Sequence, residues 1–351
     1  MDVTSLNEAG DLSICVLTAV YNDWPALSRL LTDMETEFAS DRVRIDVVVV
    51  NDASTFDMEQ DFRTWTGKPV IQSISVLDLR ANFGNQFAVA TGLRYVAEHR
   101  AFDAVLVMDA DGEDTIADAR RLIREWRQHR DSIVVARREK RSESALFKLF
   151  YALYQFTFRL LTGKTIAFGN FSVLPHTQIQ AIAGRPELPH HYSATLLRTK
   201  LPLIEIPTER GRRYAGKSSM NFPGLVFHAV AGLSVFSEVL LSRLLIATAT
   251  VASFCAIGII FVVCFRLFTS LAFPNWATTV ISFLALLASQ SILLILSSGF
   301  LLLMGRSSIL LTSLETARMV RGIRTYGPVR AAETQRSASQ PDDILASNVA
   351  N

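Results

Sequence analysis

Short apolar runs alternate with amphipathic stretches between residues 14 and 210. Runs rich in Val and Ile predict β-strands, and they lie at 14–20, 46–52, 74–79, 104–110, 132–137 and 203–209. Stretches with helical spacing of their apolar positions lie at 25–38, 86–99 and 116–129. Near-continuous apolar strands separated by helices are typical of a parallel sheet that is covered on both faces. We therefore predict an α/β fold with a mostly parallel sheet and helices on both faces.

A long apolar region begins at Leu244. No charged residue occurs from Leu244 to Phe265, and after Arg266 none occurs until Arg306. A helix needs about 20 apolar residues to cross the hydrocarbon core of a bilayer. We therefore predict transmembrane helices at about 244–266 and 277–304, joined by a short turn at 273–276. Two buried core helices are the alternative, but these apolar runs are longer than most helices of globular proteins.

Residues 222–243 come just before the first predicted span and are apolar with sparse polar positions. This pattern predicts an interfacial helix that lies along the membrane surface and leads into the bilayer. A partly buried soluble helix is the alternative.

The placement of basic residues orients the two predicted spans. Arg243 precedes the first span, and the basic residues after the second are Arg306, Arg318, Arg321, Arg324 and Arg330. Because cytoplasmic loops carry the excess of Lys and Arg, both termini are predicted to be cytoplasmic. Residues 1–13 are polar and lack the apolar core of a signal peptide. These features predict an integral protein of the inner (plasma) membrane.

The patterns divide the chain into five parts. These are an N-terminal segment (1–13), a cytoplasmic α/β domain (14–221), a membrane-surface helix (222–243), two transmembrane helices (244–305), and a basic segment with a disordered tail (306–351).

Composition adds two exclusions. Lys and Arg total 35 and Asp and Glu total 33, so the formal charge is only +2. Such a balance creates no global field for a polyanion, and we predict no nucleic-acid partner. Three cysteines in 351 residues are too few for a disulfide framework.

Polar residues follow each of the first four predicted strands. They are Tyr21, Asn22 and Asp23; then Asn51, Asp52 and Ser54; then Arg80, Asn82 and Gly84; then Asp109, Asp111, Glu113 and Asp114. Ligands of open α/β sheets bind beyond the carboxyl ends of the strands. Any one of these groups reads equally well as a turn, but their repetition predicts a binding site at one sheet edge.

Asp109 and Asp111 form the sharpest local signal. Alternate residues of an extended chain point the same way, so the two carboxylates can face one ligand. Hard oxygen donors suit Mg²⁺ or Mn²⁺, with room left for phosphate oxygens. A solvated loop is the alternative, although two carboxylates at the end of a buried strand are harder to explain that way.

The order of these motifs resembles the family 2 glycosyltransferases of GT-A fold. Within them the chain is similar to the membrane-attached polyprenyl-phosphate glycosyltransferases, which include dolichol-phosphate mannose synthase and bacterial undecaprenyl-phosphate sugar transferases. The motifs are VLTAVYND (16–23), VVVVNDAST (47–55), LDLRANFGNQFAVATGL (77–93), VLVMDADGEDT (105–115), FGNFSVL (168–174) and RGRRYAGKSSM (210–220). The resemblance covers roughly residues 13–305. It implies a GT-A, Rossmann-like sheet followed by an interfacial helix and two transmembrane helices.

The resemblance also implies roles for individual residues. Tyr21 and Asp52 match the positions that hold the nucleotide base and ribose, and Asn22, Asn82, Gly84 and Gln86 are further candidate substrate-binding residues. Asp109 and Asp111 match the metal and diphosphate motif, with Glu113 as a third candidate ligand. The pair Glu113-Asp114 usually reads Gln-Asp in the family, so Glu113 is a departure that affects metal coordination.

Two basic clusters match family positions that flank the active site. The first contains Arg137, Arg138, Lys140 and Arg141, and the second contains Arg210, Arg212, Arg213 and Lys217. They are expected to bind the donor diphosphate and the acceptor phosphate. The alternative is that each cluster simply lies on the solvated surface. In the second cluster Arg213, Gly216 and Ser218 match the family pattern, but its lysine is displaced to Lys217.

Asn170 is the most informative departure, because many relatives have an aspartate there that is a proposed base. Asparagine takes no proton at useful pH. Either a dianionic lipid phosphate attacks the sugar without a base, or the acceptor is a hydroxyl and Asp114 or another carboxylate acts as the base. The candidate catalytic residues are accordingly Asp114, Arg137, Arg141 and Asn170.

The favoured hypothesis is an inverting, metal-dependent hexosyltransferase. It would move a sugar from a UDP- or GDP-sugar to a polyprenyl phosphate at the cytoplasmic face of the bilayer. The alternatives are transfer to a hydroxyl on a lipid or polysaccharide, and a membrane-bound protein that binds nucleotide sugars without turnover. Relatives include monomers and tetramers, so a homo-oligomer stays open.

Overall fold

The computed structural model describes residues 12–56, 67–99, 102–138, 145–214, 222–268, 276–307 and 318–327. The chain divides into two compact units. The first comprises Met1–Glu143, Ile166–His228 and Ser313–Asn351, and the second comprises Ser144–Thr165 and Ala229–Thr312.

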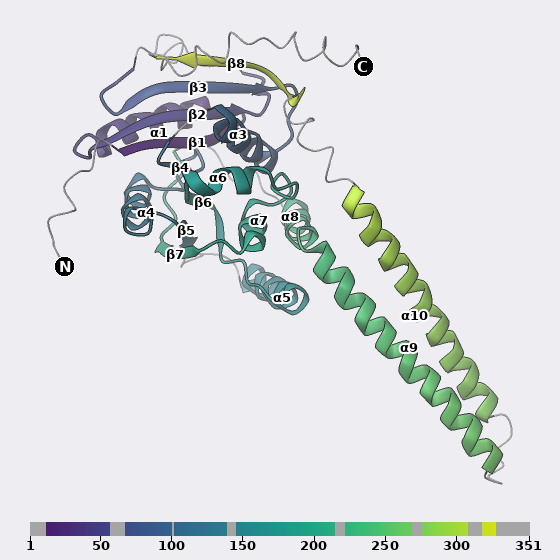
Figure 1. Cartoon of the computed structure of the whole chain (residues 1–351). Helices are drawn as coiled ribbons and strands as arrows, with labels where there is room; N and C mark the ends of the chain where they lie inside the picture. The colour runs from purple at the N-terminus through teal and green to yellow at the C-terminus, as the bar shows by residue number, and fades with distance from the viewer. Residues whose placement is uncertain are drawn as a thin grey trace, which may run out of the picture. The chain divides into compact units, whose positions relative to one another are not determined.

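The described part of the first unit contains one sheet with the strand order β7-β5-β6-β4-β1-β2-β3-β8 (Figure 1). The strands are β1 (Leu12–Val20), β2 (Val43–Asn51), β3 (Ile71–Leu79), β4 (Ala104–Val107), β5 (Ile133–Arg138), β6 (Phe168–Pro175), β7 (Leu203–Thr208) and β8 (Val320–Tyr326). Only β6 and β8 run antiparallel to their neighbours. The prediction of a mostly parallel α/β sheet is confirmed.

Helices cover both faces of this sheet. The helices that lie entirely in the described part of this unit are α1 (Trp24–Glu37), α3 (Asn85–His99), α4 (Ile116–Gln128), α6 (His176–Ala183) and α7 (Tyr192–Thr199). One core packs α1 and α4 against side chains such as Ile14 and Val16, and the other packs α3, α6 and α7 against Cys15 and Leu17. Successive β1 residues therefore enter opposite cores, as the two-residue repeat of a strand requires.

Two strands lie where the sequence pattern did not predict any. β6 begins inside the motif at 168–174, and its antiparallel direction places its first residues at the edge where β4 and β5 end. β8 lies in the basic segment after the second apolar helix and pairs with β3. Its sequence, VRGIRTY, contains two arginines and a glycine that hide its strand character.

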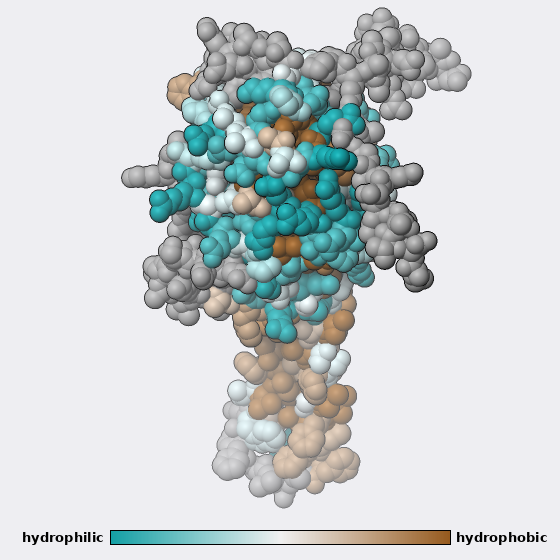
Figure 2. Space-filling view, turned by 90° about the vertical axis from the view of Figure 1, so that its left-hand side faces the viewer, coloured by the Kyte–Doolittle hydropathy of each residue, from teal (hydrophilic) through white to brown (hydrophobic). Residues whose placement is uncertain are grey.

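The second unit contains two long apolar helices, α9 (Ser237–Phe268) and α10 (Trp276–Ser307). Both are long and apolar enough to cross a membrane, with mean hydropathies of 2.4 and 2.2. Only 11% and 6% of their most apolar windows are buried, which is unlike the helices of a soluble core. In Figure 2 the described surface of these helices is mostly hydrophobic, whereas that of the sheet unit is mostly hydrophilic.

The single surface helix predicted at 222–243 is replaced by two elements. α8 spans Phe222–Ser234, and residues from Ser237 onward already belong to α9.

The second unit also contains α5 (Ala145–Thr162), which the sequence pattern did not predict. The ring of Phe158 meets that of Phe236 edge-on at 5.6 Å between centroids. Arg243 Nη1 donates a hydrogen bond to the Leu160 carbonyl at 2.6 Å. Phe156 and Leu160 leave 66% and 63% of their surface exposed. α5 is therefore attached to the start of α9 and carries exposed apolar side chains.

Gly92 sets how closely α3 approaches the sheet. A Cβ at Gly92 would overlap Leu17 Cδ1 and lie 2.8 Å from Val50 Cγ2. Alanine in a helix is normally more stable than glycine by about 1 kcal/mol, but overpacking a core costs about 1–3 kcal/mol. We expect Gly92→Ala to lower the thermal unfolding midpoint. In Gly322→Ala the added Cβ meets nothing within 4 Å, so the midpoint should stay unchanged. A more stable Gly92→Ala protein would contradict this packing.

Candidate active site

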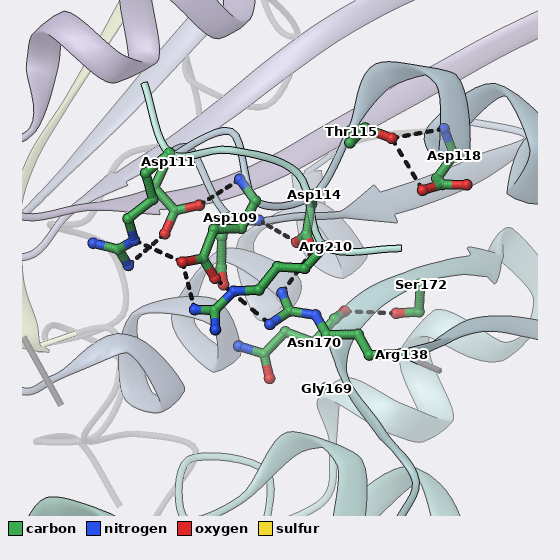
Figure 3. Close-up of polar contacts among 12 residues, drawn as sticks. Asp109, Asp111, Asp114, Thr115, Asp118, Arg138, Gly169, Asn170, Ser172 and Arg210 are labelled. Atoms are coloured by element: carbon green, nitrogen blue, oxygen red, sulfur yellow. Dashed lines mark hydrogen bonds and ion pairs between the residues drawn. The ribbon is translucent and has the colours of Figure 1, made fainter. Parts of the chain in front are cut away.

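An acidic loop of residues 109–114 follows β4 at the edge where the parallel strands end (Figure 3). Asp114 Oδ2 accepts a hydrogen bond from the backbone N–H of Asp109 at 3.0 Å. Asp111 Oδ1 accepts one from the backbone N–H of Glu113 at 2.9 Å. Gly112 between them has a φ of +86°, which favours glycine. The carboxylates of Asp111 and Asp114 therefore stabilise the backbone conformation of the loop that contains them.

A second loop, residues 210–214, packs directly on the acidic loop. Arg210 Nη2 and Arg213 Nε donate to Glu113 Oε1 at 2.5 and 2.7 Å, and Arg213 Nη2 donates to Asp111 Oδ2 at 2.6 Å. Backbone bonds add to these contacts, from Gly211 N–H to the Glu113 carbonyl and from Tyr214 N–H to the Asp111 carbonyl, both at 2.9 Å. The predicted cluster of Arg210 and Arg213 thus lies on the acidic loop.

Glycines make this close approach possible. A Cβ on Gly112 would lie 2.8 Å from the ring of Tyr214, and a Cβ on Gly211 would overlap the Gly112 carbonyl oxygen. The Tyr214 hydroxyl donates to Asp33 of α1 at 2.8 Å. The arginine loop is therefore fixed from both sides, by the acidic loop and by α1.

Arg138, rather than the predicted Arg137, completes the cluster. Arg138 Nη2 donates to Asp114 Oδ1 at 3.0 Å, and its Nη1 lies 3.6 Å from Glu113 Oε2. Arg137 instead pairs with Glu205 of β7 at 3.5 Å. Successive side chains of a strand point to opposite faces, so only one of two adjacent arginines can reach the acidic loop.

The carboxyl groups of the loop differ in their charge balance. Burial raises the pKa of Asp109, and the nearby charge of Asp111 raises it further. Burial and the charge of Asp109 raise the pKa of Asp114 to about 7, against the opposing effect of Arg138. Burial acts in the same direction on Glu113, but the bonds from Arg210 and Arg213 outweigh it and lower its pKa. The unneutralised negative charge therefore concentrates around Asp109.

Asp109 and Asp111 fit a divalent cation that arrives with its ligand. Within the part of the chain that the structure describes, no group of three His, Cys, Asp or Glu side chains could hold a metal by itself. Mg²⁺, however, is usually bound by one or two carboxylates together with substrate phosphates and water. A cation here would relieve the repulsion between Asp109 and Asp111. Arg210 and Arg213 hold Oε1 of Glu113, as Arg213 also holds Oδ2 of Asp111, so the role of Glu113 as a third ligand stays a prediction.

Asn22 holds two loops together instead of pointing to a ligand. Asn22 Oδ1 accepts from the backbone N–H groups of Thr55 and Phe56 at 2.8 and 3.3 Å, and its own N–H donates to Ser54 Oγ at 2.9 Å. Its neighbour Tyr21 is 49% exposed and free to contact a ligand. Of these two predicted contacts, Tyr21 alone faces outward.

Asp52 is likewise engaged by the protein. Its two oxygens accept from the N–H groups of Phe83 and Gly84, each at 2.8 Å, and its residue surface is 3% exposed. Asp52, which was predicted to hold the ribose, therefore positions the start of α3 with both of its oxygens, and its contact with a ribose stays a prediction. Asn82 is exposed on this loop, whereas Asn85 Nδ2 donates to Asp109 Oδ1 at 3.3 Å. Asn85 is a site residue that sequence reasoning missed, although it lies within the quoted motif.

Asn170 and Gln86 form a pair that links β6 to α3. Gln86 Nε2 donates to Asn170 Oδ1 at 3.1 Å, and Gln86 Oε1 accepts from the Tyr192 N–H at 2.6 Å. The pairing with Gln86 uses only the side-chain oxygen of Asn170, so the side-chain NH₂ can donate a hydrogen bond elsewhere. Arg141, Lys217 and Ser218 lie outside the described residues, so their predicted roles stay predictions.

The fold and this site define an α/β domain that presents a carboxylate loop and arginines at its strand ends. Residues 15–178 match the family described as glycosyl transferase family 2. This matched stretch is somewhat less than half of the chain and runs from β1 to β6 of the mixed α/β sheet, and two apolar helices follow it in the chain.

Two curated relatives, both described as glycosyltransferases, and two solved structures are similar to this chain. An uncharacterized glycosyltransferase of Synechocystis sp. is 22% identical over 64% of this chain and 70% of its own length. The uncharacterized glycosyltransferase YkcC of Bacillus subtilis is 20% identical over 80% and 85%. Mannosyl-3-phosphoglycerate synthase of Rubrobacter xylanophilus has a TM-score of 0.44 at 12% identity, covering 65% of this chain and 73% of its own. Glucosyl-3-phosphoglycerate synthase of Mycobacterium tuberculosis has a TM-score of 0.45 at 11% identity, covering 65% and 79%.

The raised pKa of Asp114 predicts how stability changes with pH. A carboxyl group whose pKa is higher in the folded protein stabilises the fold below its ordinary pKa of 3.8, and this contribution is lost as the pH rises to about 7. In EDTA, the unfolding midpoint of the wild type should therefore fall relative to that of Asp114→Asn, which has no titrating proton at this position, by about 2 °C or more over that window. Parallel curves for the two proteins would refute the prediction.

Proposed function

We propose that this chain is a membrane-attached inverting glycosyltransferase. It transfers a sugar from a nucleoside-diphosphate sugar, with uridine or guanosine as the base, to a polyprenyl phosphate. The observation that carries the proposal is the acidic loop at the strand ends, held under the arginine loop within a family 2 domain. Carboxylates for a cation and guanidinium groups for phosphates are the groups that a diphosphate ligand requires.

Asp109 and Asp111 hold Mg²⁺ or Mn²⁺ in this proposal. The metal, when bound, offsets the charge that develops on the departing nucleoside diphosphate. Asn85 orients the Asp109 carboxylate through its amide at 3.3 Å. Tyr21, which is exposed, faces the nucleotide base.

The arginines around the loop have a second use in the proposal. Arg138 and Arg210 pair with the acidic loop, but each has further donors, since a guanidinium group carries five N–H bonds. Those donors serve the diphosphate and the acceptor phosphate. Arg141, Lys217 and Ser218 are proposed to add to this phosphate-binding surface.

The acceptor is proposed to be a phosphate because neither Asp114 nor Asn170, the two candidate positions for a base, can serve as an accessible one. Asp114 has a pKa of about 7, which suits a base, but both of its oxygens accept hydrogen bonds and the residue is 3% exposed. Asn170 takes no proton, and its Oδ1 is occupied by Gln86. A phosphate monoester has a second pKa near 6 and is largely dianionic at neutral pH, so it attacks without a base.

The apolar parts of the chain support a bilayer as the location of the acceptor. α9 and α10 are long enough to cross it, and α5 exposes Phe156 and Leu160. The chain leaves the sheet at β7 before α9, and it rejoins the same sheet at β8 after α10. This connection supports a helical hairpin of α9 and α10 whose two ends lie on the same side of the membrane. The excess of arginines after α10 favours the cytoplasmic side of the inner membrane.

A transfer assay tests the proposal. Purified full-length protein, polyprenyl phosphate, UDP- or GDP-sugars and Mg²⁺ or Mn²⁺ should yield a lipid-linked sugar that mass spectrometry identifies. Asp109→Asn should reduce turnover by roughly 100-fold or more, because it removes charge stabilisation worth several kcal/mol. Asp103→Asn is the matched control, since Asp103 lies at the opposite end of β4 and bonds the Ser13 N–H.

Other outcomes separate the alternatives. Transfer only to hydroxyl-bearing lipids or polysaccharide would replace the acceptor, and nucleotide-sugar binding without any transfer would indicate a binding protein. Undiminished turnover of Asp109→Asn would exclude the proposed metal role.

A further inference from the structure

β8 brings an arginine from beyond the two long apolar helices to the edge of the sheet. Arg324 Nε donates to Asp78 Oδ2 at 2.8 Å, and Arg324 Nη2 donates to Asp78 Oδ1 at 2.7 Å. This pairing is bidentate, the geometry in which arginine binds a carboxylate most specifically. Asp78 lies near the end of β3 and is 5% exposed.

Hydrogen bonds connect the Asp78 carboxylate to the loops after β1 and β2. Asp78 Oδ1 also accepts from Asn51 Nδ2 at 2.7 Å, and Asn51 Oδ1 accepts from the Ser54 N–H at 2.9 Å. Ser54 Oγ in turn accepts from the N–H of Asn22, also at 2.9 Å. An unbroken series of hydrogen bonds therefore runs from β8 to the residue next to Tyr21.

These loops need such support because their backbone is strained. Asn22 and Ala53 both have φ of +56°, a left-handed conformation that residues with a side chain rarely adopt. Strained residues persist only where the surrounding contacts hold them. Loss of Arg324 would leave Asp78 as a buried charge without its cation. Asp78 would then move, and its bond to Asn51 would weaken.

We propose that Arg324 is a positioning residue for the donor nucleotide, acting through Asp78 and Asn51 on the loops that contain Tyr21 and Ser54. The strand that follows the two apolar helices thus completes the nucleoside side of the donor site. This inference rests on the proposed function, in which these loops receive the base of a nucleoside diphosphate.

Nucleotide binding and donor kinetics of the full-length protein test the inference. Calorimetry with UDP and with GDP measures Kd, and the transfer assay measures KM and kcat. Arg324→Gln should raise the Kd for the bound nucleotide and the donor KM about tenfold, or about 1.4 kcal/mol, because the loops that receive the nucleotide are no longer held in position. The kcat and the KM for polyprenyl phosphate should stay near wild type. Arg324→Lys keeps the charge and should recover part of the affinity.

Two control variants distinguish the positioning of the nucleotide-binding loops by Arg324 from the attachment of β8 to the sheet. Arg321→Gln makes the same charge change at an exposed position of the same strand. Thr325→Val removes the 3.3 Å contact between the hydroxyls of Thr325 and Ser75. Both should bind nucleotide like the wild type. An equal loss of affinity in Thr325→Val would overturn the specific role of Arg324.

A double variant provides a rescue. Adding Asp78→Asn to Arg324→Gln removes the uncompensated charge and keeps an oxygen that can accept from Asn51. Nucleotide affinity should return toward wild type, and this result also covers the case in which Arg324→Gln alone folds poorly. Affinity as low as, or lower than, that of Arg324→Gln would refute the route through Asp78.

The failure of this inference is distinct from the failure of the proposed function. A wild-type protein that binds neither UDP nor GDP would overturn both. A wild-type protein that binds one of them, with Arg324→Gln binding it equally well, would overturn only the role of Arg324.

Discussion

Mutual repulsion among buried carboxylates at the strand ends is the constraint on which the rest of the site depends. Asp109, Asp111, Glu113 and Asp114 lie within six residues, and Glu113 and Asp114 are only 7% and 3% exposed. Such charges are stable inside a protein only when cations and hydrogen bonds compensate them. Arg138, Arg210 and Arg213 supply that compensation from segments far along the chain. The ends of β5 and of the 210–214 loop are therefore fixed against the acidic loop by charge.

The compensation is incomplete at one place, and that incompleteness suits a ligand. Glu113 is bound by two arginines and has a lowered pKa, whereas burial and its acidic neighbours raise the pKa of Asp109. A cation bound beside Asp109 and Asp111 would supply the missing positive charge. On the other side of the site, Asp78 follows the same rule, with Arg324 as its partner. Acidic strand ends matched by distant arginines thus organise both sides of the proposed donor site.

Sequence patterns predicted the strands that are apolar throughout and missed those that are not. β1 to β5 lie within a few residues of their predicted positions, because strands buried on both faces read as runs rich in Val and Ile. β7 was also predicted, although most of its residues are only partly buried or exposed. β8 was missed because two arginines and a glycine interrupt its apolar positions at a sheet edge. α5 was missed, and the surface helix was predicted as one element although Val235 and Phe236 interrupt it before α9. Neither feature leaves a periodic signal strong enough to place a boundary.

The sequence by itself determined the α/β class, the acidic loop after β4 and the two apolar helices, since each depends on local periodicity or on neighbouring residues. Tertiary structure alone decided how the polar residues are used. It assigned Arg138 instead of Arg137 to the acidic loop, gave Asn85 the contact to Asp109, and turned Asn22 and Asp52 inward to hold loops. The reason is that a side chain's role depends on which face of its strand it occupies and on which distant backbone groups need a partner. Neither property is encoded in the spacing of residues along the chain.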